Sequence, residues 1–306
     1  FDFDYDEDIV YGQGFMHETL NSQNKVAIPL KLDVYTPVNE SVNRPLFVFI
    51  HGGGFKSGSK QQNAIRTIAE FYARRGWVFI SIDYRVVVES QTVPVTYSVG
   101  TVPNEWASVT ATLLNNGNPI SEEDRASTNQ MYPAVRDAKA ALRWIIANKD
   151  NYNINTGYIT VGGVSAGANI SKTIAISEFS DFTNEISIEE DSTLSTTNLG
   201  QEYEIKTIVD FWGGLGTSDL LEMTYGRNLF DSDDPVLYKA HGTADNTVPF
   251  QSALDLQGIY NSIGVIMKLD ELTGEGHSAF DATINGKRLE ELAFEFIVEQ
   301  QNLTVE

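Results

Sequence analysis

The chain has 306 residues, of which 42% are hydrophobic and none is cysteine, so it can bury one large core but contains neither a disulfide nor a thiol nucleophile. Its 42 acidic residues outnumber its 21 lysines and arginines, and the net charge of −21 argues against nucleic acid and anionic membrane surfaces as partners. No apolar stretch reaches the roughly 18 residues that span a bilayer, so we expect no stable membrane insertion.

Apolar segments with strand and helix patterns alternate along most of the chain, and this alternation predicts a single α/β domain over residues 1–306 with a mostly parallel sheet and helices on both faces. An acidic run, Asp2–Asp8, precedes them; it lacks the glycine and distal glutamate of a calcium loop, and we expect a solvated segment. The expected strands are 30–36, 45–50, 77–83, 158–162, 205–211, 235–240 and 265–270, and the expected helices are 63–75, 132–147, 165–177, 252–263 and 289–300.

Two long segments do not fit this alternation. Residues 86–131 contain three prolines with several glycines and asparagines, and residues 178–204 are rich in serine, threonine, asparagine and glutamate. Irregular segments of this length in a compact domain are usually functional or disordered. We expect both to be parts of a cap over the substrate site; the alternative is surface decoration without contact to substrate.

Three consecutive glycines follow the strand expected at 45–50, in His51-Gly-Gly-Gly-Phe55. Such a loop lets the backbone N–H groups of Gly53 and Gly54 turn toward a common point, as an oxyanion hole requires. A phosphate-binding loop is the poorer alternative, because neither the GxxxxGK[ST] nor the GxGxxG spacing is present.

The most informative motif is Gly163-Val-Ser-Ala-Gly167, which follows the strand expected at 158–162 and opens the helix expected next. In a strand–turn–helix context this pentapeptide forces the central serine into a strained conformation that only flanking glycines can accommodate. Ser165 is therefore the predicted nucleophile, displayed beside the positive end of a helix. The N–H of Ala166 is the third predicted oxyanion donor.

Two further polar residues complete a chain order typical of serine hydrolases. The strand expected at 235–240 runs into His241-Gly-Thr-Ala-Asp245, and His277 follows the last strand between glycines. In the order Ser165, Asp245, His277 the histidine is the general base and the aspartate orients it. Asp210, at the end of the preceding strand, is a competing acid.

The other histidines fit this triad less well. His51 and His241 stand at strand ends before glycine, where a structural role is the better interpretation, and His17 lies in a polar N-terminal stretch. Phe55, beside the glycine loop, and Trp212, after the strand at 205–211, could line the substrate pocket or belong to the core.

With these motifs the chain resembles the carboxylesterase and lipase branches of the α/β-hydrolase superfamily, and especially esterases with HGGG and a Ser-Ala-Gly turn, including the hormone-sensitive-lipase-like group. Ser81-Ile-Asp-Tyr-Arg85 is similar to a strand-end sequence of those enzymes. Two features depart from that group. Val164 stands where it usually has aspartate, and the segment ending at Asp245 is closer to dienelactone hydrolases, feruloyl esterases and prolyl oligopeptidases. The subfamily, and with it the substrate, stays open.

The resemblance implies a serine carboxylesterase that acts through an acyl-enzyme, needs neither a metal nor an organic cofactor, and favours short to medium acyl chains on a small-molecule or polymer-borne ester. The alternatives are a lipase, an acetyl or feruloyl esterase acting on polysaccharide decorations, an acyltransferase and, more remotely, a peptidase or a catalytically silent interaction module. The chain begins with Phe1 rather than methionine, which favours a processed bacterial protein, secreted or periplasmic; the alternative is the cytoplasm. The oligomeric state stays open.

Overall fold

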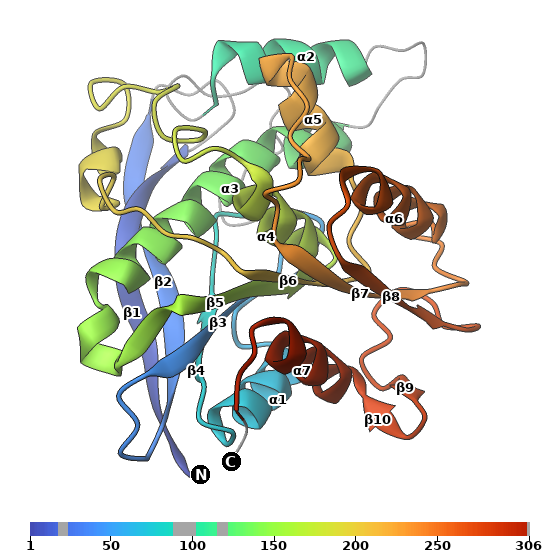
Figure 1. Cartoon of the computed structure of the whole chain (residues 1–306). Helices are drawn as coiled ribbons and strands as arrows, with labels where there is room; N and C mark the ends of the chain where they lie inside the picture. Colours follow the sequence, from blue (N-terminus) through green and yellow to red (C-terminus); the bar gives the residue numbers. More distant parts are fainter. Residues whose placement is uncertain (18–23, 88–101, 115–121, 305–306) are drawn as a thin grey trace.

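A computed structural model of the chain describes residues 1–17, 24–87, 102–114 and 122–304. Its centre is an eight-stranded sheet in the order β1-β2-β4-β3-β5-β6-β7-β8 (Figure 1). β2 pairs antiparallel with both β1 and β4, and every other neighbouring pair is parallel. The strands are β1 (Phe3–His17), β2 (Lys25–Pro37), β3 (Arg44–Ile50), β4 (Val78–Ile82), β5 (Ile154–Val164), β6 (Thr207–Phe211), β7 (Val236–Gly242) and β8 (Met267–Leu272). A small hairpin adds β9 (Thr283–Ile284) and β10 (Lys287–Arg288).

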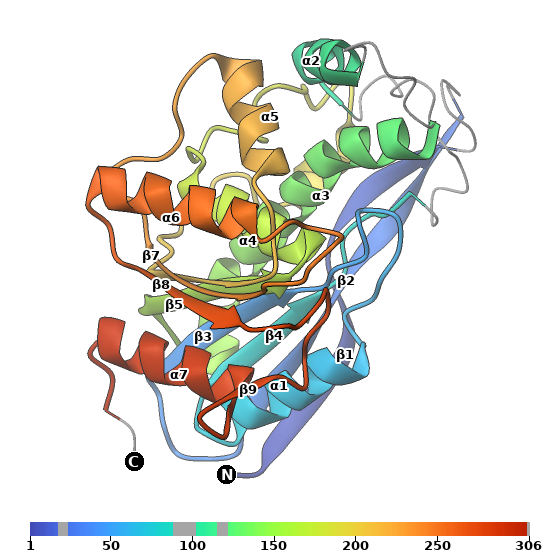
Figure 2. The ribbon, with the colours of Figure 1, turned by 90° about the vertical axis from the view of Figure 1, so that its right-hand side faces the viewer.

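Helices cover both faces of the sheet. In Figures 1 and 2, α3, α4 and α6 lie on one face and α1 and α7 on the other, while α2 and α5 lie beyond α3 and α4. The helices are α1 (Asn63–Ala73), α2 (Asn104–Leu114), α3 (Glu122–Ala147), α4 (Ala166–Ile176), α5 (Gly216–Tyr225), α6 (Gln251–Ile263) and α7 (Leu289–Gln300), with short 3₁₀ turns at Lys149–Tyr152 and Ser192–Thr196.

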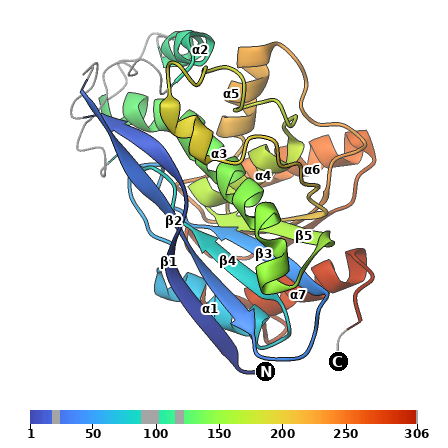
Figure 3. The same cartoon turned by 90° about the vertical axis from the view of Figure 1, so that its left-hand side faces the viewer.

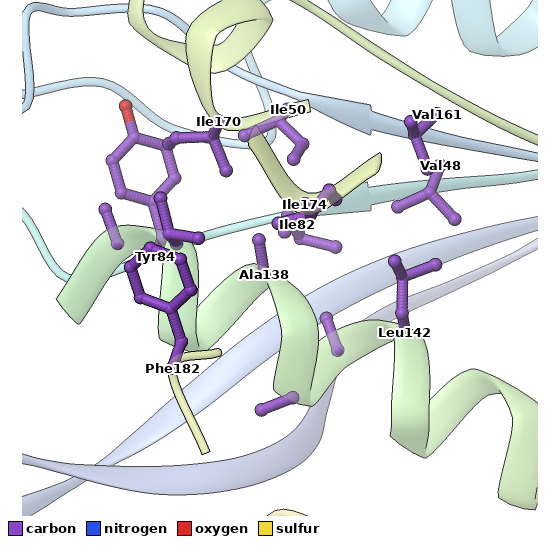
Figure 4. Close-up of a cluster of buried hydrophobic side chains, with 14 of the residues drawn as sticks. Val48, Ile50, Ile82, Tyr84, Ala138, Leu142, Val161, Ile170, Ile174 and Phe182 are labelled. Atoms are coloured by element: carbon purple, nitrogen blue, oxygen red, sulfur yellow. The ribbon is translucent and has the colours of Figure 1, made fainter. Parts of the chain in front are cut away.

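The sequence of β3 shows how the sheet acquires two different cores. Successive side chains of a strand point to opposite faces. Val48 and Ile50 therefore face α3 and α4, where they join a mainly aliphatic cluster (Figure 4). Phe47 and Phe49 face the other way and belong to an aromatic cluster with Tyr72 of α1, whose ring lies edge-on to Phe47 with the centroids 4.7 Å apart. Both faces are thus buried, as a mostly parallel sheet requires.

The acidic residues of the N-terminal run are exposed to solvent, as expected, but the run was not predicted to be a strand. It forms the first half of β1, an edge strand that pairs with β2 along a long twisted ribbon (Figure 3). Phe3 and Tyr5 alternate with the aspartates and pack on Tyr35, with ring centroids 5.9 and 4.7 Å away. Asp8 is paired with Lys31 and Lys60, at 2.9 and 2.8 Å. The alternation of aromatic and acidic residues is a strand pattern of period two.

The segment 86–131 is not irregular throughout, because it contains α2 and the first turns of α3. Its residues 88–101 and 115–121 lie outside the described part of the chain. Pro133 lacks an N–H and usually interrupts a helix, which is why the sequence predicts a start near residue 132; the structure carries α3 through it. The residues of α3 after Pro133 are buried against the sheet, and this packing outweighs the hydrogen bond that Pro133 cannot form.

Residues 178–204 lie along α3 and β1 (Figure 3). The Gln13 N–H donates to Thr196 Oγ1 at 2.9 Å, and Lys25 Nζ donates to the Glu190 carbonyl at 2.7 Å. Phe182 packs against Trp106 of α2 and Tyr132 of α3, with centroids 6.0 and 5.1 Å apart. The role of residues 178–204 in a cap over the substrate site remains a prediction.

Candidate active site

The turn between β5 and α4 carries the strained serine that the sequence predicts. Ser165 has φ 54° and ψ −119°, a left-handed conformation that is uncommon outside glycine. A Cβ on Gly167 would lie 2.1 Å from the Ile50 carbonyl oxygen, and one on Gly163 would lie 2.5 Å from the carbonyl carbon of Gly167. Glycine is therefore required on both sides, because strand and helix backbones approach too closely for any side chain.

Three side chains from three separate loops meet at this turn. His277 Nε2 lies 2.9 Å from Ser165 Oγ, and His277 Nδ1 lies 2.7 Å from Asp245 Oδ2. With the proton on Nδ1, the imidazole donates to the carboxylate and accepts from the serine hydroxyl. The Asp245 carboxylate is fully buried, whereas the His277 side chain is 19% exposed. The accessible end of the array is thus the serine–histidine pair.

The carboxylate of Asp245 is held in its ionised form. Its Oδ1 accepts backbone N–H bonds from Thr247 at 2.8 Å and Val248 at 2.9 Å. Burial alone would raise the pKa of Asp245, but the hydrogen bond from His277 and these two N–H bonds outweigh it and lower the pKa. A negative charge beside Nδ1 therefore persists throughout the neutral range.

The glycine loop after β3 lies directly against the serine turn. A Cβ on Gly52 would be 3.2 Å from Ser165 Cβ and 2.9 Å from the Val164 carbonyl oxygen. Gly53 has φ +120°, and its carbonyl accepts N–H bonds from Lys56 and Ser57 at 3.0 and 3.1 Å, which fold the loop back on itself.

This packing places the start of the loop at the serine. Gly53 and Gly54 are exposed there. Ala166, the first residue of α4, has an N–H with no partner inside the helix. Their role as oxyanion donors stays a prediction.

His51 keeps that loop in shape, in line with its expected structural role. Its ring stacks on Tyr84 with centroids 4.3 Å apart, and the Tyr84 hydroxyl donates to the His51 carbonyl at 3.2 Å. Burial lowers the pKa of His51 to about 4, so the ring is neutral at pH 7. Its Nδ1 lies 2.7 Å from the Gly52 carbonyl oxygen and, protonated, donates to it.

Phe55 and Trp212 are both buried, at 4% and 1% exposure, and both have positive φ, 62° and 46°. Phe55 packs near Tyr84, with centroids 6.4 Å apart. The ring of Trp212 stands edge-on to His277 at 6.4 Å and to Phe280 at 4.9 Å. Trp212 therefore packs against the ring of His277. Whether either residue also contacts substrate stays a prediction.

Asp210, the competing acid, points into a different environment. Its two carboxylate oxygens pair with Lys172 Nζ at 3.1 Å and Lys239 Nζ at 2.6 Å, and all three side chains are completely buried. The structure therefore brings Asp245, and not Asp210, to the histidine. Sequence reasoning missed this lysine pair, although single charged residues inside the apolar stretches of α4, β6 and β7 are a recognisable sign of buried ion pairs.

Within the described ranges, no group of three or more histidine, aspartate or glutamate side chains could hold a metal ion. None of the helices there is long and apolar enough to cross a membrane.

The strand order, the strained serine between β5 and α4, and the order of the three polar residues define an α/β hydrolase. The chain belongs to the BD-FAE family, which matches residues 32–97 and 103–236. The match includes the glycine loop and Ser165 but ends before Asp245 and His277. The positions of these last two residues therefore rest on the geometry.

Similar proteins include esterases of known structure. Esterase 2 of Thermogutta terrifontis, with propionate bound, superposes with a TM-score of 0.62 at 24% identity and covers 96% of this chain and 97% of its own. Its apo form gives 0.61 at 25% identity, with the same shares covered.

Curated relatives match a shorter stretch. The medium-chain fatty acyl-CoA hydrolase precursor of Anas platyrhynchos is 29% identical over 168 residues, which are 53% of this chain and 24% of that protein. Pyrethroid hydrolase Ces2a of Mus musculus is 31% identical over 140 residues, or 45% and 19% of the two chains. The chain thus spans about a quarter, or less, of the length of these relatives.

Proposed function

We propose that this chain is a serine carboxylesterase. The observation that carries the proposal is the continuous array from Ser165 Oγ through His277 to the buried Asp245 carboxylate, with contacts of 2.9 and 2.7 Å. In this arrangement the histidine can take the serine proton, and the carboxylate stabilises the imidazolium that results. The similar esterase from Thermogutta terrifontis is described as bound to propionate, bound to butyrate and phosphorylated by paraoxon, which supports a nucleophilic serine and short acyl groups.

The proposed reaction has two acyl-transfer steps. Ser165 Oγ attacks the ester carbonyl while His277 Nε2 takes its proton, and the N–H groups of Gly53, Gly54 and Ala166 receive the oxyanion. Collapse of this intermediate expels the alcohol, which takes the proton from His277. The same histidine then activates a water molecule that hydrolyses the acyl-enzyme and restores the serine.

The finer substrate assignment is an ester with a short to medium acyl chain. Its test is hydrolysis of p-nitrophenyl esters from acetate to palmitate. A maximum at short chains supports the carboxylesterase, and a maximum at long chains indicates a lipase. Inactivity toward this series together with activity on acetylated or feruloylated polysaccharide indicates a polysaccharide esterase.

Replacement of the nucleophile is the first prediction. We expect Ser165→Ala to lower kcat by roughly 10⁴- to 10⁶-fold, because only water and the oxyanion donors remain. Labelling by a fluorophosphonate should disappear in the same variant. Retention of more than about a tenth of the activity would refute the assignment of Ser165, since removing a covalent nucleophile costs far more. Asp245→Asn should be nearly as damaging, because it favours the wrong tautomer of His277.

A further inference from the structure

His241 lies directly behind the buried acid. Its Nε2 is 2.9 Å from the Val248 carbonyl oxygen and 3.3 Å from Asp245 Oδ2, and its side chain is completely buried. A carbonyl oxygen only accepts hydrogen bonds, so Nε2 carries the proton and donates it to the Val248 carbonyl, while Asp245 Oδ2 lies near the same N–H group. His241 Nδ1 has no hydrogen-bond partner among the described residues. The ring is therefore oriented by its Nε2 contacts.

These contacts link His241 to the groups around the carboxylate. Oδ1 receives the N–H groups of Thr247 and Val248, Oδ2 receives the N–H of His277 at 2.7 Å, and His241 Nε2 lies 3.3 Å from Oδ2. Val248 takes part twice, since its N–H binds Asp245 while its carbonyl binds His241. His241 therefore closes the turn from Asp245 to Val248 from its buried side and limits rotation of the carboxylate.

Burial, helped by one neighbouring positive charge, keeps His241 neutral. Lys239 on its own strand, Asp210 on β6 and Asp245 on its own loop act on it, Lys172 of α4 stands behind Asp210, and the ring of Phe250 lies edge-on at 5.9 Å. Burial and the positive charge of Lys239 lower the pKa of His241 and outweigh the two carboxylates. A neutral ring supplies the single N–H that these contacts need, without a further buried charge.

We propose that His241 is a positioning residue for the acid of the triad: its Nε2–H holds the Val248 carbonyl, the Val248 N–H holds Asp245 Oδ1, and the carboxylate is thereby directed toward His277. The proposal rests on the serine carboxylesterase function proposed above. His241 is proposed to act through the orientation of the Asp245 carboxylate, which contacts the catalytic histidine. His241 itself is buried and reaches neither the serine nor the accessible end of the array.

Three substitutions separate the effect of the His241 Nε2–H donor from the effect of the side-chain volume. His241→Gln can place its amide N–H near the position of Nε2, His241→Asn places it near Nδ1, and His241→Met fills the volume without a donor. We expect Met and Asn to lower kcat on the order of 10- to 100-fold with little change in KM, because a loosened carboxylate misplaces the base. His241→Gln should stay within a few fold (~3) of wild type, since the donor is retained.

The pH profile provides a measurement that a purely structural role would not change. Loss of the Nε2–H group, whose positive end lies near Asp245 Oδ2, makes the carboxylate a better acceptor for the His277 imidazolium, so the acid limb of kcat/KM should move to higher pH in the Met and Asn variants. In His241→Gln the limb should stay in place.

Equal losses in Gln, Asn and Met, or a wild-type kcat and pH profile in Met, would overturn the proposal. If Met does not fold, the Gln–Asn comparison alone decides, because both side chains are polar amides. A wild type inactive on every ester contradicts the proposed function instead. The rate of fluorophosphonate labelling then replaces kcat in the same comparison.

Discussion

Backbone strain occurs at several single residues around the site. Four non-glycine residues with positive φ adjoin it, namely Phe55, Ser165, Trp212 and Ser278. Each such residue costs on the order of 1–3 kcal/mol and persists only where its surroundings hold it. For Ser165 these include its N–H bond to the Phe211 carbonyl at 2.9 Å and the Asn169 N–H bond to its own carbonyl at 3.1 Å. The first turn of α4 and the end of β6 thus hold the strained serine in place.

For single residues we also predict opposite effects on stability from two glycine-to-alanine substitutions. Gly167→Ala places a Cβ 2.1 Å from a carbonyl oxygen of β3 and should destabilise the protein by about 1–3 kcal/mol or more while reducing esterase activity. Gly258→Ala, within α6 and with nothing within 4 Å, is the matched control and should stabilise by up to about 1 kcal/mol. Urea unfolding and ester hydrolysis measure both effects. Wild-type stability and activity in Gly167→Ala would contradict the close packing of the turn.

Three elements of the fold are joined by one buried ion cluster. Lys172 of α4 and Lys239 of β7 pair with Asp210 of β6, and they also donate to the carbonyls of Gly214 and Gly213 at 2.7 and 2.8 Å. These carbonyls belong to the loop that leads from Trp212 into α5. Removing one partner from a buried cluster leaves an uncompensated buried charge. The loss of one member therefore costs more stability than the intact cluster contributes.

We therefore predict that Asp210→Asn destabilises the protein by about 3–5 kcal/mol, whereas Asp245→Asn chiefly removes activity. Burial would raise the pKa of Asp210, but Lys172 and Lys239 outweigh it and lower the pKa below its usual value. The stabilisation from Asp210 is therefore fully present above the unfolded pKa of about 3.9 and is lost as pH falls from there through the lower pKa of the folded state. Urea unfolding at pH 7 and under acid conditions checks this. A greater loss of kcat in a well-folded Asp210→Asn than in Asp245→Asn would make Asp210 the acid.

For the whole molecule, the net charge of −21 implies that the folded chain repels itself. The buried pairs described above are shielded from solvent and respond little to salt. Screening should therefore act mainly on unpaired carboxylates at the surface.

We predict that NaCl raised from about 10 mM to about 500 mM increases Tm, because the Debye length falls from roughly 30 Å to a few ångströms. Sucrose at matched osmolality is the control for excluded-solute effects, and the salt increment should exceed it. A Tm that is unchanged or lower in salt would mean that exposed ion pairs outweigh the repulsion.

Local patterns in the chain were enough to predict the fold and the serine turn. Alternating apolar periods mark the strands and helices, and the glycines of His51–Phe55 and of Gly163–Gly167 mark backbone turns whose constraint lies within a few residues. β1 was missed because its aspartates hid the alternating aromatics, and α2 because prolines and glycines surround it. The cap role of 86–131 and 178–204 and export from a bacterial cell stay predictions.

The partners of buried charges depended on the folded arrangement. Asp210 and Asp245 both follow or end apolar strands, and although the loop position of Asp245 favoured it as the acid, the sequence alone does not exclude Asp210. Packing does, because α4 and β7 bring two lysines to Asp210, while the loop after β8 brings His277 to Asp245. The same packing sets His241 against the acid. Electrostatic contacts act through space between residues far apart in the chain, so their partners are known only once the sheet has assembled.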